Sequence, residues 1–194
     1  SFEAWSKELT QALELAVDHL SLYQLTIEDG TAFADRLSIG GLKGLPKEEL
    51  AGDMYDLTQE ICAKAGMPAY EVSNHAPEGS ESRHNLIYWR GGDYIGIGPG
   101  AHGRLTLAGE RFATEAPKAP NLWLQKALTQ GNAELPRTLL SAEERGLEYL
   151  LMSLRLSEGM DIARYQELSG TILAEPALDE LHEYDLIKIE SGQL

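Results

Sequence analysis

The segment His19-Leu-Ser-Leu-Tyr-Gln-Leu-Thr-Ile27 carries the first evidence of the fold class. It is a short, nearly continuous apolar run with β-branched and aromatic members, a pattern typical of a strand buried on both faces. A helical pattern follows at residues 46–65, with Pro46 at its start and Gly66 just past its end. Residues 68–73 then read as a second strand. Strand, helix and strand in this order predict a βαβ unit with parallel strands and a right-handed crossover.

The segments on either side extend this predicted α/β layer. Apolar residues at helical spacing predict a helix over residues 2–17, almost at the first residue of the chain. Residues 93–98 predict a third strand, which follows a long loop at 74–92. The last residues, 187–194, read as a strand and a turn with no returning strand. We therefore expect a piece of a longer protein, in which residues 1–113 form an α/β layer or part of a (β/α) barrel.

The second part of the chain, residues 114–194, has a mainly helical pattern. Ser141 followed by Glu144 predicts a capping box at the start of one helix, Asp161 caps the next, and Pro176 begins the last. Three short helices followed by a hydrophobic strand form a winged-helix-like pattern. The segment from Ser141 onward nevertheless carries only four Lys or Arg against twelve Asp or Glu. We therefore expect a structural cap or a partner surface rather than a DNA-binding domain.

Composition excludes several classes of protein. The 194 residues are 43% hydrophobic and 24% charged, which excludes intrinsic disorder. The net charge of −15 repels phosphate backbones, so we expect no nucleic-acid partner. No run approaches the ~20 apolar residues of a membrane span. The single cysteine, Cys62, excludes an intramolecular disulfide and any all-cysteine metal cluster built by this chain alone.

The run Gly98-Pro-Gly-Ala-His-Gly103 matches the dinucleotide-binding pattern G-x-G-x-x-G. That pattern needs a helix whose N-terminus receives the pyrophosphate, whereas residues 104–111 resemble a hairpin. We therefore reject the Rossmann interpretation. The glycines allow the backbone to approach a flat ligand closely, and a tight bend without any ligand explains them equally well.

The loop after the second predicted strand is the densest polar and aromatic segment. Glu71, His75 and His84 could supply metal ligands, although their spacing fits no compact zinc signature. A zinc-dependent barrel hydrolase is therefore a distant alternative. An imidazole beside the pair Tyr88-Trp89 also fits an axial ligand or an edge contact to a planar macrocycle. In the competing interpretation His84 caps a helix or accepts a hydrogen bond, and the two aromatic residues are core.

Four motifs taken together resemble a known family. It is the oxygen-independent coproporphyrinogen III oxidase-like family of radical S-adenosylmethionine (SAM) proteins, and within it the HemW heme chaperones. The motifs are His19-Leu-Ser-Leu-Tyr-Gln-Leu-Thr-Ile-Glu28, Tyr70-Glu-Val-Ser-Asn74, Ser82-Arg-His-Asn-Leu-Ile-Tyr-Trp89 and Asp93-Tyr-Ile-Gly-Ile-Gly-Pro-Gly-Ala-His102. The similarity spans nearly the whole chain. The block from His84 to Trp89 matches His-Asn-x-x-Tyr-Trp, which separates the chaperones from the true oxidase and is associated with heme binding.

The resemblance implies a fold and a set of cofactors. It implies that residues 1–113 are the last βα units of an incomplete (β/α)6 radical SAM barrel. Residues 114–194 would be the small, mainly helical C-terminal domain of the HemN type. Family members carry a Cys-x3-Cys-x2-Cys motif that holds a 4Fe-4S cluster, to which SAM binds. That motif is absent from this sequence, so we expect no radical chemistry from this chain alone.

The resemblance also assigns site residues and a function. It implies heme-binding residues His84, Asn85, Tyr88 and Trp89, SAM-binding residues Thr26, Ala101 and His102, and residues Tyr23, Gln24, Glu71 and Asn74 at the same barrel mouth. The implied function is binding heme and transferring it to membrane-bound acceptor proteins. The alternative is coproporphyrinogen III oxidase, which decarboxylates two propionates through a 5′-deoxyadenosyl radical. Either function implies a heme or porphyrin partner and a location in the cytoplasm or peripherally at the inner membrane. Because the first barrel strands are absent, we also expect exposed apolar surface and self-association, for example as a homodimer.

Overall fold

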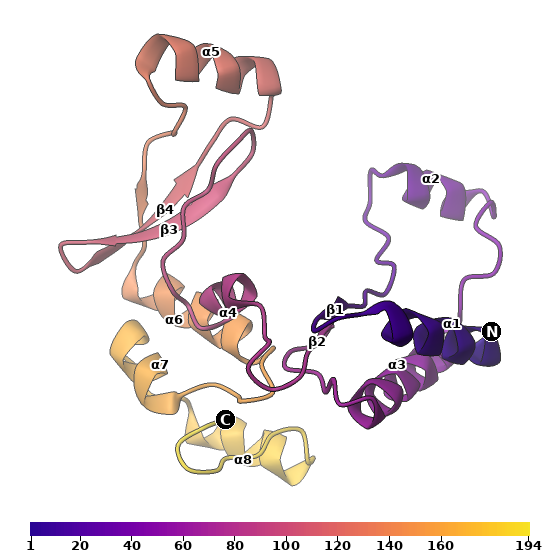
Figure 1. The fold of residues 1–194 in the computed structure, drawn as a ribbon. Helices are drawn as coiled ribbons and strands as arrows, with labels where there is room; N and C mark the ends of the chain where they lie inside the picture. Colours follow the sequence, from indigo (N-terminus) through magenta and orange to yellow (C-terminus); the bar gives the residue numbers. More distant parts are fainter. The chain divides into compact units, whose positions relative to one another are not determined.

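The computed structural model describes all 194 residues, which divide into two compact units, residues 1–81 and residues 82–194 (Figure 1). The first unit holds three helices and a two-stranded sheet, and the second holds five helices and a three-stranded sheet. The expected domain boundary after residue 113 falls inside strand β4 (Glu110–Glu115) and stays a prediction about the family's domains. No helix combines the length and the hydropathy that crossing a bilayer requires.

Two packed helices form the framework of the first unit. Helix α1 (Phe2–Leu15) and helix α3 (Glu48–Lys64) confirm the two helices predicted from apolar periodicity. Gly66 follows α3 with a φ of 76°, a left-handed conformation that favours glycine past a helix end. The indole Nε1 of Trp5 on α1 donates a hydrogen bond of 2.8 Å to Thr58 Oγ1 on α3, and this bond links the two helices.

A short helix, α2 (Ala32–Ser38), lies where the sequence indicated only a loop. Thr31 begins it, because its side chain accepts a hydrogen bond from the Ala34 amide. Its apolar residues Phe33 and Leu37 are both about half exposed, so α2 contributes little to the core.

The predicted parallel pairing of residues 19–27 with 68–73 is wrong. Strand β1 (Leu20–Ser21) pairs with strand β2 (Asn74–His75), and the pairing is antiparallel, with Leu20 opposite His75. The helix α3 therefore joins two antiparallel strands, and the expected right-handed parallel crossover does not form.

A tight turn reverses the chain immediately before β2 and explains the antiparallel direction. The Tyr70 amide donates to the Asn74 carbonyl at 3.1 Å, which closes the turn. Inside it, the Glu71 carboxylate accepts hydrogen bonds from the Ser73 amide and hydroxyl, each at 2.8 Å. A buried carboxylate thus takes the place of ladder partners, and the chain leaves the turn in the opposite direction.

The predicted strand over residues 93–98 is also wrong. Only Tyr94 forms a bridge there, antiparallel to Arg104, and Ile95 and Ile97 are exposed. The reason is the conformation of the glycines that follow. Gly98 has a φ of 111°, outside the β region, so the chain departs from an extended ladder there.

The segment after the glycines is a β-hairpin, as predicted. Strand β3 (His102–Leu107) pairs with β4 through the two-residue turn at Ala108 and Gly109, both of which have positive φ. A short strand, β5 (Thr138–Leu139), adds to the other edge of β4. The glycine-rich run therefore leads into a strand, which confirms the rejection of the dinucleotide-binding interpretation.

Five helices complete the second unit. Helix α4 (Arg83–Trp89) occupies part of the predicted long loop at 74–92, and Ser82 caps it. Helix α5 (Pro120–Gln130) follows the hairpin and ends at Gly131, which adopts the left-handed conformation.

The caps predicted for the C-terminal helices are confirmed. Ser141 and Glu144 form the capping box of α6 (Ala142–Ser153), and Asp161 caps α7 (Ile162–Ser169). Helix α8 (Glu175–Glu183) follows, with its proline in the first turn. The predicted terminal strand is reduced to isolated bridges at Gln193, so the winged-helix interpretation is not confirmed. The core of this region is formed by Tyr149, Leu156 and Met160.

Candidate functional site

Helix α4 presents His84 at the surface of the second unit. The Ser82 hydroxyl accepts a hydrogen bond from the Asn85 amide at 3.3 Å, which fixes the start of the helix. His84 is exposed and makes no hydrogen bond to the protein, and its ring meets Tyr88 edge-on with centroids 4.7 Å apart. The two residues are one helical turn apart, so helical geometry itself brings them together. The imidazole nitrogens are accordingly free to bind a ligand.

Tyr88 and Trp89 pack in different directions from α4. The Tyr88 ring packs against the Tyr94 ring at a tilt of 52° with centroids 4.2 Å apart, and the Arg155 guanidinium lies 4.5 Å from the centre of the Trp89 ring. The indole Nε1 of Trp89 is buried without a hydrogen-bond partner. His84 and Tyr88 are therefore brought together as predicted, whereas one face of Trp89 is covered by an arginine and Trp89 helps to pack α4.

A small cavity of about 50 Å³ lies beside Tyr88 and is lined by three arginines. Arg104 pairs with Glu148 at 2.6 Å, and this hydrogen-bonded contact raises the pKa of Arg104. Arg111 pairs with Asp93 at 3.0 Å, but burial outweighs that contact and lowers the pKa of Arg111.

The third arginine of this cavity has no such partner. The Nε of Arg145 is buried and makes no hydrogen bond. Its only acidic neighbour in the cavity wall is Glu148, which Arg104 already engages. A carboxylate is the group that would satisfy this donor. The sequence could not reveal this site, because the three arginines come together only when the hairpin packs on α6.

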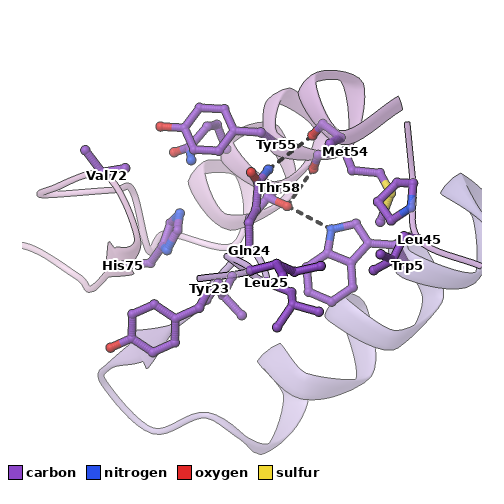
Figure 2. A pocket seen from close by; sticks show the side chains of 15 residues that line it. Trp5, Tyr23, Gln24, Leu25, Leu45, Met54, Tyr55, Thr58, Val72 and His75 are labelled. Carbon is purple, nitrogen blue, oxygen red and sulfur yellow. Dashed lines mark hydrogen bonds between the residues drawn. The ribbon is translucent and has the colours of Figure 1, made fainter. Parts of the chain in front are cut away.

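An apolar cavity of about 310 Å³ lies in the first unit. Figure 2 shows side chains of α1, α3 and the segment after β1 around it, with Trp5 on one side and His75 on the other. Tyr23 and Gln24, two residues expected at a barrel mouth, both line it. The Gln24 amide is already engaged, because it donates to the Ala51 carbonyl at 3.2 Å.

His75 lines this cavity, and its ring nitrogens have no hydrogen-bond partners in the fold. It is 1% exposed, and neither ring nitrogen makes a hydrogen bond. Burial is the main cause that lowers its pKa, so the ring is neutral near pH 7. The Nε2 of Gln59, in the wall of the same cavity, is also buried without a partner.

Glu71 and Asn74 do not line this cavity. The Glu71 carboxylate accepts from the Asn74 side-chain NH2 group, and the side-chain oxygen Oδ1 of Asn74 accepts from the Ser21 hydroxyl at 2.5 Å. Both residues are buried and serve the turn and the β1–β2 ladder. Of the four residues expected at one mouth, the structure brings Tyr23 and Gln24 to a cavity and uses the other two in the fold.

The expected SAM-binding residues have no common site within either unit. Thr26 is exposed in the first unit. In the second unit, the Ala101 carbonyl accepts from the Ala116 amide, and His102 Nδ1 lies 3.5 Å from Glu115 Oε1. Their role toward SAM stays a prediction.

The residues of this chain do not fit an iron–sulfur cluster or a zinc site. Cys62 is the single cysteine, it is fully buried in α3, and burial raises the pKa of its thiol. A cubane with three thiolate ligands therefore cannot be held by this chain. No three His, Cys, Asp or Glu residues are placed to hold a metal, so the hydrolase alternative with Glu71, His75 and His84 has no support.

Comparison with known proteins identifies the family. Residues 140–194 match the HemN C-terminal domain. The chain is 33% identical over 183 residues to the heme chaperone HemW of Escherichia coli. The matched region makes up 93% of this chain and 46% of that protein. It is 35% identical over 195 residues to the HemW of Mycobacterium tuberculosis, covering 97% of this chain and 48% of that protein.

A mitochondrial relative and a solved structure agree with these matches. Radical S-adenosyl methionine domain-containing protein 1 of Danio rerio is 37% identical over 164 residues, or 82% of this chain and 37% of that protein. The solved coproporphyrinogen III oxidase HemN of Escherichia coli, a radical SAM enzyme, matches with a TM-score of 0.72 at 17% identity, over 99% of this chain and 47% of that one. The chain thus spans less than half the length of these proteins. The resemblance found in the sequence motifs is confirmed, and the chain belongs to the family that includes HemN and the heme chaperone HemW.

Proposed function

We propose that this chain contributes the heme-binding part of a heme chaperone, and that heme binds at α4. The exposed His84, which makes no hydrogen bond and contacts Tyr88 edge-on, is the observation that carries the proposal. The name heme chaperone, which several relatives carry, supports it.

The residues around His84 fit the chemistry of heme. Heme iron accepts an imidazole nitrogen as an axial ligand, and His84 offers one without first breaking a hydrogen bond. Tyr88 adds an aromatic surface beside the imidazole, of the kind that contacts a flat apolar ring system. The small cavity that Tyr88 lines also contains Arg145, which could serve as a cationic group for a propionate.

The remaining functions belong to the whole protein and are part of the same proposal. Transfer of the bound heme to membrane-bound acceptors, at the inner membrane or in the cytoplasm, would follow from the chaperone role. The 4Fe-4S cluster and SAM would require cysteines that this chain lacks. Coproporphyrinogen III oxidase is the alternative, supported by the fold similarity to HemN. The His-Asn-x-x-Tyr-Trp block at α4 favours the chaperone.

Heme titration of the His84→Ala variant tests the proposal. We expect the dissociation constant for hemin to rise at least tenfold and the Soret band of any residual complex to shift, because the axial nitrogen is lost. His182→Ala is the matched control, since His182 is also exposed but lies on α8, and it should bind hemin as the unaltered chain does.

Circular dichroism and thermal unfolding accompany the titration. They show whether weaker hemin binding results from the missing imidazole or from a loss of structure. Truncation of an exposed histidine should leave the melting temperature nearly unchanged. Hemin affinity and Soret position that are the same with and without His84 would remove α4 from the heme site.

A further inference from the structure

We propose that the cavity in residues 1–81 is a second binding site, for a small uncharged aromatic molecule that carries a carbonyl group and an N–H or O–H donor. This site lies in the first unit and takes a different ligand from the heme proposed at α4. Its existence does not depend on that proposal.

The first argument is the pair of unsatisfied polar groups in one cavity wall. Buried polar atoms in folded proteins almost always have hydrogen-bond partners, and a buried atom without one costs free energy. His75 is 1% exposed and both of its ring nitrogens lack a partner, and Gln59 Nε2 is buried without one. Both residues line the same cavity, so one ligand could satisfy both.

The chemistry of these two groups defines the polar part of the ligand. The Gln59 amide nitrogen can only donate, so it requires an acceptor such as a carbonyl oxygen. A neutral imidazole offers one donor and one acceptor, so His75 can accept a hydrogen bond from an N–H or O–H of the ligand. The ligand would therefore carry an acceptor and a donor on one apolar body.

The walls define the rest of the ligand. Trp5, Leu25, Met54, Tyr55 and Val72 give an apolar and partly aromatic lining (Figure 2). No Asp, Glu, Lys or Arg lines the cavity, which disfavours a charged ligand. A volume of about 310 Å³ is at the lower end for small-molecule sites. A molecule of one or two rings fits these dimensions, and a tetrapyrrole does not.

Trp5 provides a built-in reporter for this site. Its indole N–H is held by Thr58 at 2.8 Å while its ring lines the cavity. The other two tryptophans, Trp89 and Trp123, lie in the second unit. A ligand in the cavity should therefore shift one indole N–H resonance and leave the other two in place.

Benzamide is the probe, because it combines a ring, a carbonyl and an N–H donor, and toluene is the apolar comparison. In an NMR titration of the full chain we expect benzamide to shift the Trp5 indole resonance saturably and to bind more tightly than toluene. Absence of a saturable shift, or equal affinities for the two molecules, would overturn the proposal. Equal affinities would mean that the polar groups contribute nothing, for example because ordered water satisfies them.

Variants test whether benzamide binds in this cavity, and they distinguish the contribution of the polar groups from that of the cavity volume. We expect His75→Phe and Gln59→Leu each to weaken benzamide binding about fivefold to tenfold, since each loses one hydrogen bond and keeps the bulk of the side chain. Ala51→Leu should abolish binding by filling the cavity from α3. Gly52→Ala, one position further along α3 and with open space around the added methyl, should have no effect.

Circular dichroism reports whether each of these variants is folded. Should His75→Phe fail to fold, Gln59→Leu and Ala51→Leu carry the test alone. Binding that persists unchanged in Ala51→Leu would place benzamide elsewhere and overturn the proposal.

Discussion

The cavity in residues 1–81 differs in packing and hydrogen bonding from the hairpin–α6 region, by which we mean residues 94–115 and helix α6. Around the cavity, the ring nitrogens of His75 and Nε2 of Gln59 have no hydrogen-bond partners, and the mostly apolar walls enclose a volume of about 310 Å³. In the hairpin–α6 region a methyl group on Gly96 would collide with backbone, and Arg104 is matched to Glu148 by several hydrogen bonds.

The capacity of this fold to bind a ligand depends on local space and on polar groups without partners. At Gly96 and at the Arg104–Glu148 pair the chain's own atoms fill the space and complete the hydrogen bonds, whereas the nearby Arg145 Nε stays unsatisfied. A region with room and unsatisfied groups has capacity left for a ligand. The contrast can be measured, because atoms added to the two regions should change stability in opposite directions.

The largest effect is expected for Gly96→Ala. The new Cβ would lie 2.3 Å from the His102 carbonyl oxygen, so backbone has to move. We expect a loss of about 3 kcal/mol in the free energy of unfolding, measured by urea denaturation with tryptophan fluorescence. Gly52→Ala is the matched control on α3, where a methyl meets nothing and should add about 0.5–1 kcal/mol. Equal stabilities of the two variants would remove the contrast.

A middle-sized effect is expected for the Arg104–Glu148 pair. Their side chains are 21% and 33% exposed, so the pair is mostly withdrawn from water. Arg104→Met leaves the Glu148 carboxylate without its partner, and we expect a loss of about 2 kcal/mol. The double variant Arg104→Met/Glu148→Leu should recover most of it, which urea denaturation of all four proteins would show. Additive losses would mean that the two side chains are not coupled.

The smallest effect, of opposite sign, is expected for His75→Phe. Removing two unsatisfied nitrogens while keeping a ring should raise the free energy of unfolding by about 1 kcal/mol at pH 7. The control is His19→Phe, which should destabilise, because His19 Nε2 lies 2.9 Å from the Tyr70 hydroxyl and that hydrogen bond would be lost. A His75→Phe variant that is less stable than the unaltered chain would show that the imidazole has a partner after all.

His75 should also make the stability of the chain depend on pH. Burial lowers its pKa in the folded chain, so below about pH 6.5 the unfolded chain binds a proton that the folded chain does not. Proton binding to His75 in the unfolded chain therefore lowers the free energy of unfolding as the pH falls from about 6.5 toward the lowered pKa, and this loss is absent at higher pH. The free energy of unfolding should be lower at pH 5 than at pH 7, and this decrease should be smaller in His75→Phe than in the unaltered chain.

Elements with local signals could be predicted from the sequence. The α3 helix has both an apolar stripe and a terminal glycine, and the capping box at Ser141 is a contact between residues three positions apart. The strands could not be predicted as well, because an apolar run does not specify its partner. The direction of β2 depends on the Glu71 carboxylate inside a turn, which no periodicity reports.

The same distinction applies to the candidate sites. His84 and Tyr88 could be found from the sequence because they lie four residues apart in one motif on one helix. The apolar cavity could be found only in part, through Tyr23 and Gln24. Trp5 and Gln59 come from helices far apart in the sequence, and they meet only because α1 packs on α3.

The arginine pairs of the second unit have a consequence for domain exchange between relatives. The region that matches the HemN C-terminal domain begins at residue 140, yet Arg104 pairs with Glu148, and Arg90 with Glu158, across that point. A chimera joined at residue 140 would separate both pairs and the contact of Arg155 with Trp89. The segment that recombination can transfer intact therefore begins near Ser82, so residues 82–139 should come from the same parent as the C-terminal domain.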